Sequence, residues 1–138
     1  MTKTETIETK LKRFHSAFNH PVNERYPQKI SMHSGEGEFK LIDKHKTLRR
    51  KLIMEEYEEV LDAIENKKPD EILKELCDLV YVCVGFAVTY GWNFDAAFNR
   101  VHDSNMSKLD EKGHPVFRKD GKVIKSDCYR PPQLTDLV

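Results

Sequence analysis

The stretch LIMEEYEEVLDAIENKKPDEILKELCDLVYVCVGFAVTYGW, from Leu52 to Trp92, decides the fold. Apolar residues recur in it at spacings of three and four, which is the period of an amphipathic helix. Proline is favoured in the first turn of a helix, and glycine just after the last turn. Pro69 and Gly91 therefore bound the second half, and the stretch predicts two helices joined by a short turn.

We expect these two helices at about Asp43 to Asn66 and Pro69 to Tyr90. The apolar face of the first is formed by Leu48, Leu52, Ile53, Tyr57, Val60, Leu61 and Ile64. The end of the second, LVYVCVGFAV, is apolar on nearly every side, so it must be covered from several directions. This helix is either the centre of a bundle or a contact with another subunit.

Two further helices and a hairpin complete the predicted fold. One helix, about Thr4 to Asn19, ends before His20-Pro21, and another begins at Asn93 or Asp95 and ends near Lys108. The run PVFRKDGKVIK has two strand-like segments around Asp-Gly, a strong hairpin signal. The prediction is an all-α, four-helix-bundle-like domain with a small C-terminal β-hairpin. We treat residues 1–138 as one domain, with a long loop at 19–39 and the hairpin and tail at 110–138.

Composition restricts the function. The chain has 138 residues, 23 Lys plus Arg and 23 Asp plus Glu, and this balance argues against non-specific nucleic-acid binding. Three cysteines without CxxC spacing argue against a disulfide framework and a zinc ribbon, and favour a reducing cytoplasm. No apolar signal-peptide core follows the first residues, and the longest apolar run is too short to span a membrane.

Acidic residues border the apolar face of the helix at about 43–66. At 100° per residue, Glu56 falls inside the edge of that face, and Glu55 and Glu59 lie beside it. Glu58 and Glu65 point away and fit ordinary solvated charges.

The next helix carries Glu71, Glu75 and Asp78 along one side. Antiparallel helices joined by a short turn pack side by side, so the two acidic edges can face each other. Several carboxylates in one place repel, and a bound cation removes that cost. Oxygen-only ligands suit Mg²⁺, with Mn²⁺ as the alternative, better than zinc. The other interpretation is two solvated helix faces stabilised by local ion pairs.

The order of these motifs resembles the MazG-like, all-α nucleoside triphosphate pyrophosphohydrolases, which include dimeric dUTPase-type and phosphoribosyl-ATP pyrophosphohydrolase-type enzymes. Their EExxE and ExxD motifs are similar to EEYEE at 55–59 and ELCD at 75–78, and the following VHDSNMSKL and the tail also resemble the family. The resemblance implies a MazG-type fold and Mg²⁺-dependent hydrolysis between the α- and β-phosphates. It implies the metal ligands Glu56, Glu59, Glu75 and Asp78, and it leaves open whether Glu55 is a further ligand or the catalytic base. We therefore take Glu55 and Glu56 as the catalytic candidates.

Basic and polar residues near the C-terminus are candidates for substrate binding. Asn105 and Lys108 share a helix face, and Lys125 and Tyr129 could close over a polyphosphate. The alternatives are a lysine that complements the helix dipole and an exposed basic hairpin. His15 and His102 are more often satisfied helix residues than ligands in such positions.

The leading hypothesis is a cytoplasmic enzyme that converts a (deoxy)nucleoside triphosphate to its monophosphate and pyrophosphate, as a homodimer or higher homo-oligomer. We expect no nucleic-acid or membrane partner. One alternative is a phosphoribosyl-nucleotide pyrophosphohydrolase of the same fold. Another is a non-catalytic helical binding or assembly module. Base and sugar preference are left open.

Overall fold

The computed structural model describes residues 3–27 and 43–138, which contain α1 (Ile7–Ala17), α2 (Lys44–Asn66), α3 (Pro69–Thr89), α4 (Phe94–Met106), β1 (Val116–Phe117), β2 (Val123–Ile124) and the short 3-10 helix η1 (Thr135–Leu137). The prediction of a helical protein with a small C-terminal hairpin is confirmed. The chain forms two compact units, Met1–Trp92 and Asn93–Val138, which we describe separately. Part of the predicted 19–39 loop lies outside the described residues.

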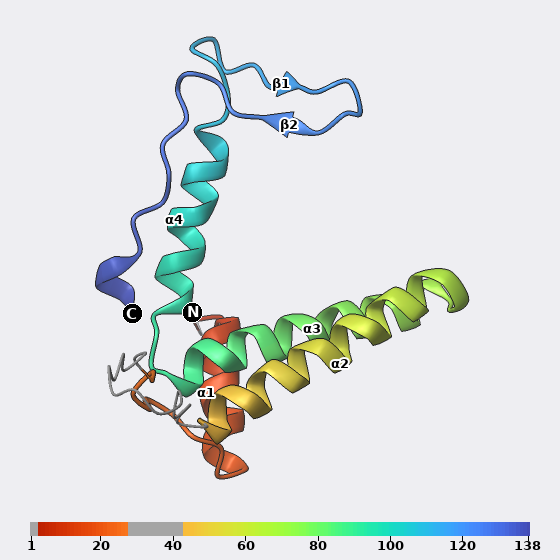
Figure 1. Cartoon of the computed structure of the whole chain (residues 1–138), viewed down its shortest axis with the longest axis vertical. Helices are drawn as coiled ribbons and strands as arrows, with labels where there is room; N and C mark the ends of the chain where they lie inside the picture. Colours follow the sequence, from red (N-terminus) through yellow and green to blue (C-terminus); the bar gives the residue numbers. More distant parts are fainter. Residues whose placement is uncertain (1–2, 28–42) are drawn as a thin grey trace, which may run out of the picture. The chain divides into compact units, whose positions relative to one another are not determined.

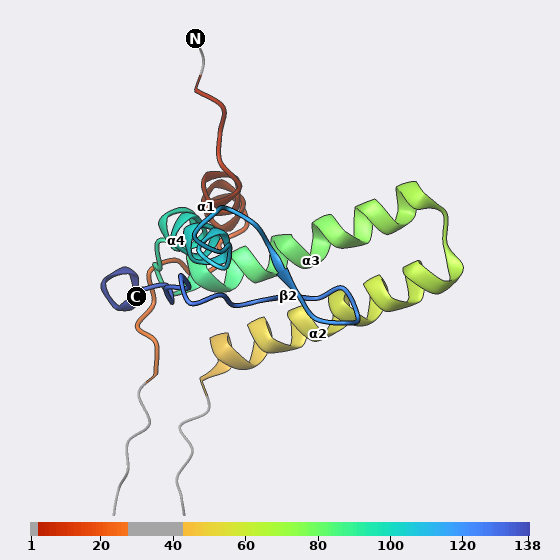
Figure 2. The same cartoon turned by 90° about the horizontal axis from the view of Figure 1, so that it is seen from above.

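In the first unit, α2 and α3 run antiparallel and side by side, and α1 packs against α3 (Figures 1 and 2). The boundaries follow local chemistry. Thr6 caps α1 through its side chain, Asp43 caps α2, and Pro69 stands at the start of α3. Gly91 adopts the positive φ of 70° expected just after a helix end.

The core of this unit lies along the packed faces of the three helices. Its buried side chains come mostly from α1 and the end of α3, with Val60 and Ala63 from α2. After α1 the chain turns at Asn19, whose φ is positive, and then lies along the end of α3. There Asn23 N–H donates to the Val88 carbonyl and Glu24 N–H to that of Thr89.

The predicted apolar face of α2 was placed incorrectly. Of its seven residues only Val60 is buried, while Leu48, Tyr57, Leu61 and Ile64 are about half exposed. The face that meets α3 is rotated toward Arg49, which is 3% exposed, and toward the partly buried Glu56. The apolar residues of α2 cover a wider arc of the helix than the part that contacts α3. The face predicted from all of these apolar residues is therefore centred away from the observed contact with α3.

In the second unit, Asn93 caps α4 by accepting from Ala96 N–H. The two short strands pair antiparallel, with Val116 opposite Ile124, and Gly121 takes a φ of 85° in the turn between them. The tail then follows α4, because Arg100 forms a two-pronged ion pair with Asp136. Within the part of the chain that the structure describes, no helix has both the length and the apolar character that crossing a bilayer requires.

Candidate metal centre

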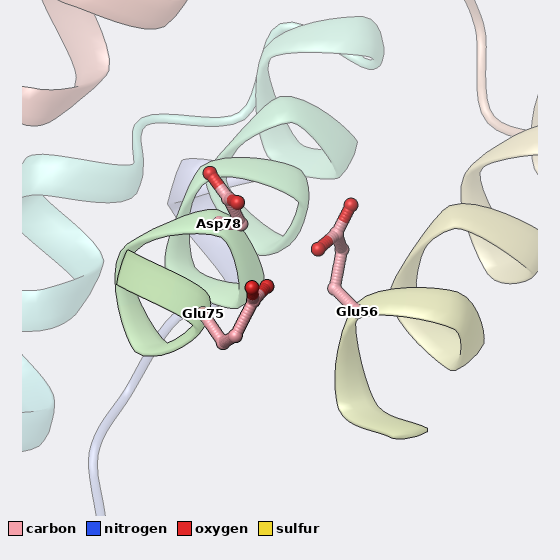
Figure 3. A group of neighbouring side chains, drawn as sticks. All are labelled: Glu56, Glu75 and Asp78. Atoms are coloured by element: carbon pink, nitrogen blue, oxygen red, sulfur yellow. The ribbon is translucent and has the colours of Figure 1, made fainter. Parts of the chain in front are cut away.

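Three carboxylates from α2 and α3 converge at the contact between these helices. Glu56 comes from α2, and Glu75 and Asp78 come from successive turns of α3 (Figure 3). One oxygen of each lies within 4.8 Å of the others. Residues three apart on a helix share a face, so packing α2 against α3 brings Glu56 opposite both acids of α3.

Glu56 is the electrostatic centre of this group. Burial raises the pKa of its carboxyl, and the nearby charges of Glu59, Asp78 and Glu75 raise it further. Its Oε2 atom is buried and has no hydrogen-bond partner among the described residues. A buried carboxylate oxygen without a donor is costly, and a cation at this point would remove the cost.

The donor set fits a hard divalent cation. It consists of carboxylate oxygens only, without sulfur or imidazole, and this is the ligand chemistry of Mg²⁺ and Mn²⁺. All three acids are partly buried, so the group has one protected side and one side open to solvent. A metal held here would keep coordination positions free for other oxygen ligands.

Lys74 supplies positive charge to the same group. Its Nζ lies 2.7 Å from Asp78 Oδ2 and 3.2 Å from Glu75 Oε1. Hydrogen bonds to Asp78 and Glu75 raise the pKa of Lys74. Sequence reasoning missed this residue, although its i, i+4 spacing from Asp78 is the spacing of a helical ion pair.

Glu55 and Glu59, the other predicted acids of α2, lie beside the cluster and are exposed. Glu55 is 3.8 Å from Lys51 Nζ in a loose ion pair, and the charge of Glu59 acts on Glu56. Both line an open groove of about 830 Å³ between α2 and α3. Glu58, expected on the outer side, is exposed and also lines this groove.

The four predicted substrate-binding residues belong to the second unit. Asn105 is in the last turn of α4, and the Lys108 carbonyl accepts from Ser126 N–H, which places the chain after β2 beside the end of α4. Lys125 Nζ lies 4.3 Å from the centre of the Tyr129 ring. Within this unit, the structure therefore gathers polar and basic groups near one end of α4.

The two histidines considered from the sequence differ in environment. His102 is exposed on α4, whereas His15 is fully buried and hydrogen-bonded to the Pro21 carbonyl. Near His15 lie His20 and Arg49, which sequence reasoning did not select. Arg49 precedes Glu56 by two helical turns and so lies on the same face of α2.

Comparison with known proteins agrees with this architecture. The chain belongs to the phosphoribosyl-ATP pyrophosphohydrolase family, whose pattern matches residues 11–105. This family is part of the MazG-like nucleoside triphosphate pyrophosphohydrolase superfamily, so the predicted resemblance is confirmed. At the level of this family, the activity is that of a pyrophosphohydrolase.

A viral protein is similar over much of the chain. It is the uncharacterized protein L479 of Acanthamoeba polyphaga mimivirus, 29% identical over 113 residues. The match covers 82% of this chain and 39% of the viral protein, so the chain spans well under half of that relative.

Proposed function

We propose that this protein is a Mg²⁺-dependent nucleoside triphosphate pyrophosphohydrolase that cleaves between the α- and β-phosphates. The observation that carries the proposal is the convergence of Glu56, Glu75 and Asp78, together with the buried Glu56 Oε2, which has no hydrogen-bond partner among the described residues. Family membership supports the same class of reaction.

Glu56, Glu75 and Asp78 would hold the metal, and Glu59 is the fourth candidate because it acts on the same carboxylate. Mg²⁺ bound there would neutralise phosphate charge and stabilise the charge that develops on the attacked phosphorus and on the leaving group. The ion requires oxygen ligands and keeps several positions for water or phosphate, which suits a cluster open on one side.

Glu55 and Glu56 are the candidates for the general base. The oxygen of water forms a bond to the α-phosphorus, the bond from that phosphorus to the bridging oxygen breaks, and pyrophosphate leaves. The carboxylate accepts the proton that water loses. Substitution of the general base by its amide should abolish turnover and leave metal binding intact. Substitution of a residue that only binds the metal should reduce metal binding as well.

Asn105, Lys108, Lys125 and Tyr129 are proposed to bind the phosphates. Their support is chemical, since an amide and two ammonium groups gather near one end of α4 and a phenol lies beside one of them. Ammonium groups bind phosphate as point charges.

We further propose a homodimer or higher homo-oligomer in the cytoplasm. On α2, Met54, Tyr57, Leu61 and Ile64 are about half exposed, as are Leu73, Leu76 and Val80 on α3. Exposed apolar surface of this extent is typical of subunit contacts. The three free cysteines fit a reducing compartment.

Hydrolysis of a phosphoribosyl nucleotide is the second candidate function. The observation that favours it is the matched family, which is described by that activity. Both reactions break the same phosphoanhydride, so the metal cluster serves either one.

The test is pyrophosphate release from each (deoxy)nucleoside triphosphate and from phosphoribosyl-ATP with Mg²⁺ present. Release of pyrophosphate with a nucleoside monophosphate is expected, and release of orthophosphate with a diphosphate would contradict cleavage at the α–β bond. Asp78→Asn should abolish activity and metal binding, whereas Glu65→Gln, on the exposed side of α2, should change neither. No hydrolysis of any substrate, with metal binding unchanged in Asp78→Asn, would leave a non-catalytic helical module.

A further inference from the structure

Two buried serines at the end of α4 hold one residue of the C-terminal tail. Ser104 and Ser107 are 7% and 8% exposed, and residues three apart share one face of a helix. Ser104 Oγ donates to the Arg130 carbonyl at 2.7 Å, and Arg130 N–H donates to Ser107 Oγ at 2.9 Å. Both backbone groups of Arg130 are therefore satisfied by serine hydroxyl groups.

The hydroxyl of Ser107 is itself fixed in direction. Its Oγ lies 2.6 Å from the Ser104 carbonyl and 3.4 Å from that of Arg130, and a carbonyl only accepts. The single hydroxyl proton therefore goes to the nearer Ser104 carbonyl, which is a known pattern for serines at the end of a helical turn. The lone pairs of Oγ stay available for Arg130 N–H, so the two serines act together on one residue of the tail.

The neighbouring tail residues restrict the backbone of Arg130 further. On the N-terminal side, Ser126 Oγ donates to the Leu109 carbonyl at 2.7 Å, and Tyr129 N–H donates to the Ser126 carbonyl. On the C-terminal side stands Pro131, and a residue before proline is restricted to extended backbone conformations. Arg130 is thus fixed from both directions along the chain.

The side chain of Arg130 contrasts with this fixed backbone. It is exposed and forms no ion pair or side-chain hydrogen bond with the residues that the structure describes. The other two arginines of the unit are paired through two nitrogens each, Arg100 with Asp136 and Arg118 with Asp120. Arg130 therefore combines a held backbone with a guanidinium that is open to a ligand.

Two further cations lie close to this point in the chain. Lys108 directly follows Ser107, and its carbonyl accepts from Ser126 N–H. Lys125 directly precedes the same Ser126. Within the described parts of the chain, neither lysine is in an ion pair, and the exposed Asp127 of this turn is in none either. The end of α4 thus gathers three positive side chains that are not neutralised by direct contact.

We infer that Arg130 binds the polyphosphate of the substrate, and that Ser104 and Ser107 are positioning residues that hold it in place. This inference rests on the proposed function for its ligand and adds residues that the proposal does not contain. A guanidinium offers a planar fork of N–H groups that fits two phosphate oxygens at once, whereas each lysine binds as a point charge. A fixed backbone reduces the entropy that is lost when the ligand orders the side chain.

The first measurement is calorimetric titration with pyrophosphate at a fixed Mg²⁺ concentration, because it does not require turnover. Arg130→Met should weaken pyrophosphate binding by about 10- to 100-fold, the range expected for hydrogen bonds from a charged donor. Its thermal stability should be unchanged, since the side chain has no partner within the described residues. Arg118→Met is the matched control and should change the affinity by less than about 2-fold, because that guanidinium is already paired with Asp120.

The serines are tested through Arg130. Ser107→Ala should weaken pyrophosphate binding by about 3- to 10-fold, and it should have no further effect when combined with Arg130→Met, because a positioning residue acts only through the residue that it positions. Ser107→Thr keeps the hydroxyl and should restore the affinity. Ser104→Ala should repeat the pattern at the Arg130 carbonyl. A loss from Ser107→Ala that is equally large beside Arg130→Met would overturn the positioning role.

The outcomes separate this inference from the proposed function. Unchanged pyrophosphate affinity in Arg130→Met, or no binding of pyrophosphate to the unsubstituted protein, would overturn the inference even if triphosphates are hydrolysed. Conversely, pyrophosphate binding that depends on Arg130, without hydrolysis of any nucleotide, would support the phosphate site and refute the enzyme.

Discussion

The α2–α3 pair carries two groups of opposite charge, the carboxylates of the metal cluster and the guanidinium of Arg49, and they differ in how far each is open to solvent. At the metal cluster, Glu56, Glu75 and Asp78 are only partly buried, and Glu56 Oε2 has no hydrogen-bond partner among the described residues. At Arg49, which is 3% exposed, the buried Nε likewise has no partner within residues 3–27 and 43–138. A cation from solvent can satisfy the first group, whereas the second is closed to solvent.

Neither region is optimised for the stability of the free protein. Carboxylates at short distance repel, and a buried charge without a counter-ion costs free energy. Such costs at one site are typical of function, because the ligand removes them.

The largest effect is expected from removing a ligand of the metal cluster. Asp78→Asn should lower Mg²⁺ affinity and pyrophosphohydrolase activity by at least about 100-fold, more than is typical for an outer-shell residue. Calorimetry and a pyrophosphate assay measure the two quantities. An unchanged Mg²⁺ affinity in this variant would contradict the assignment of Asp78 as a metal ligand.

The opposite effect on stability is expected at Arg49. Arg49→Met should raise the free energy of unfolding of the ligand-free protein by about 1–3 kcal/mol, since a buried charge that forms no ion pair within the described residues is replaced by an apolar chain of similar length. Chemical denaturation followed by circular dichroism measures it. Destabilisation instead would mean that Arg49 is a structural residue whose charge is satisfied in the free protein.

Sequence alone was sufficient for the helices and for the placement of Glu75 and Asp78 on one face of α3. Pro69 and Gly91 bound α3 as expected, and Asn93 caps α4. The spacing of Glu75 and Asp78 placed them on one face, which the structure directs toward Glu56. Local signals of this kind depend on a few neighbouring residues and on helix geometry, so they are readable without tertiary contacts.

The burial of Arg49 and His15 could not be predicted in this way. A charged residue such as Arg49 is assigned to the solvent side by default, because only the packing of α1 and α3 against α2 buries it. The burial of His15 also depends on tertiary structure, because the chain returns after α1 and places the Pro21 carbonyl beside the imidazole ring. The exposed Leu61 and Ile64 mislead in the other direction, because they draw the predicted face of α2 away from its contact with α3.

The charge repulsion within the metal cluster gives a smaller effect, which depends on pH. Burial and the neighbouring acids raise the pKa of Glu56 in the folded protein. Between the usual glutamate pKa and the raised one, the folded protein holds a proton that the unfolded chain has released. The free energy of unfolding therefore falls as pH rises through that window.

Glu56→Gln removes this titration. With EDTA present, the variant should match the unsubstituted protein near pH 4 and should exceed its Tm by about 2–4 °C near pH 7. Added Mg²⁺ should raise the Tm of the unsubstituted protein and not that of the variant. Equal Tm values at every pH without metal would show that Glu56 bears no electrostatic cost.

The smallest effect is expected from Lys74, whose ammonium group contacts Asp78 and Glu75 in the absence of a metal. A divalent cation bound by these acids has to compete with that contact. Lys74→Met should therefore increase Mg²⁺ affinity by about 2- to 5-fold, the range that an exposed ion pair supports. Lys51→Met, which removes the looser pair with Glu55, should leave the affinity unchanged. The increase should shrink at high salt, because exposed ion pairs are screened. A decrease in affinity instead would mean that Lys74 orients the two carboxylates for the metal rather than competing with it.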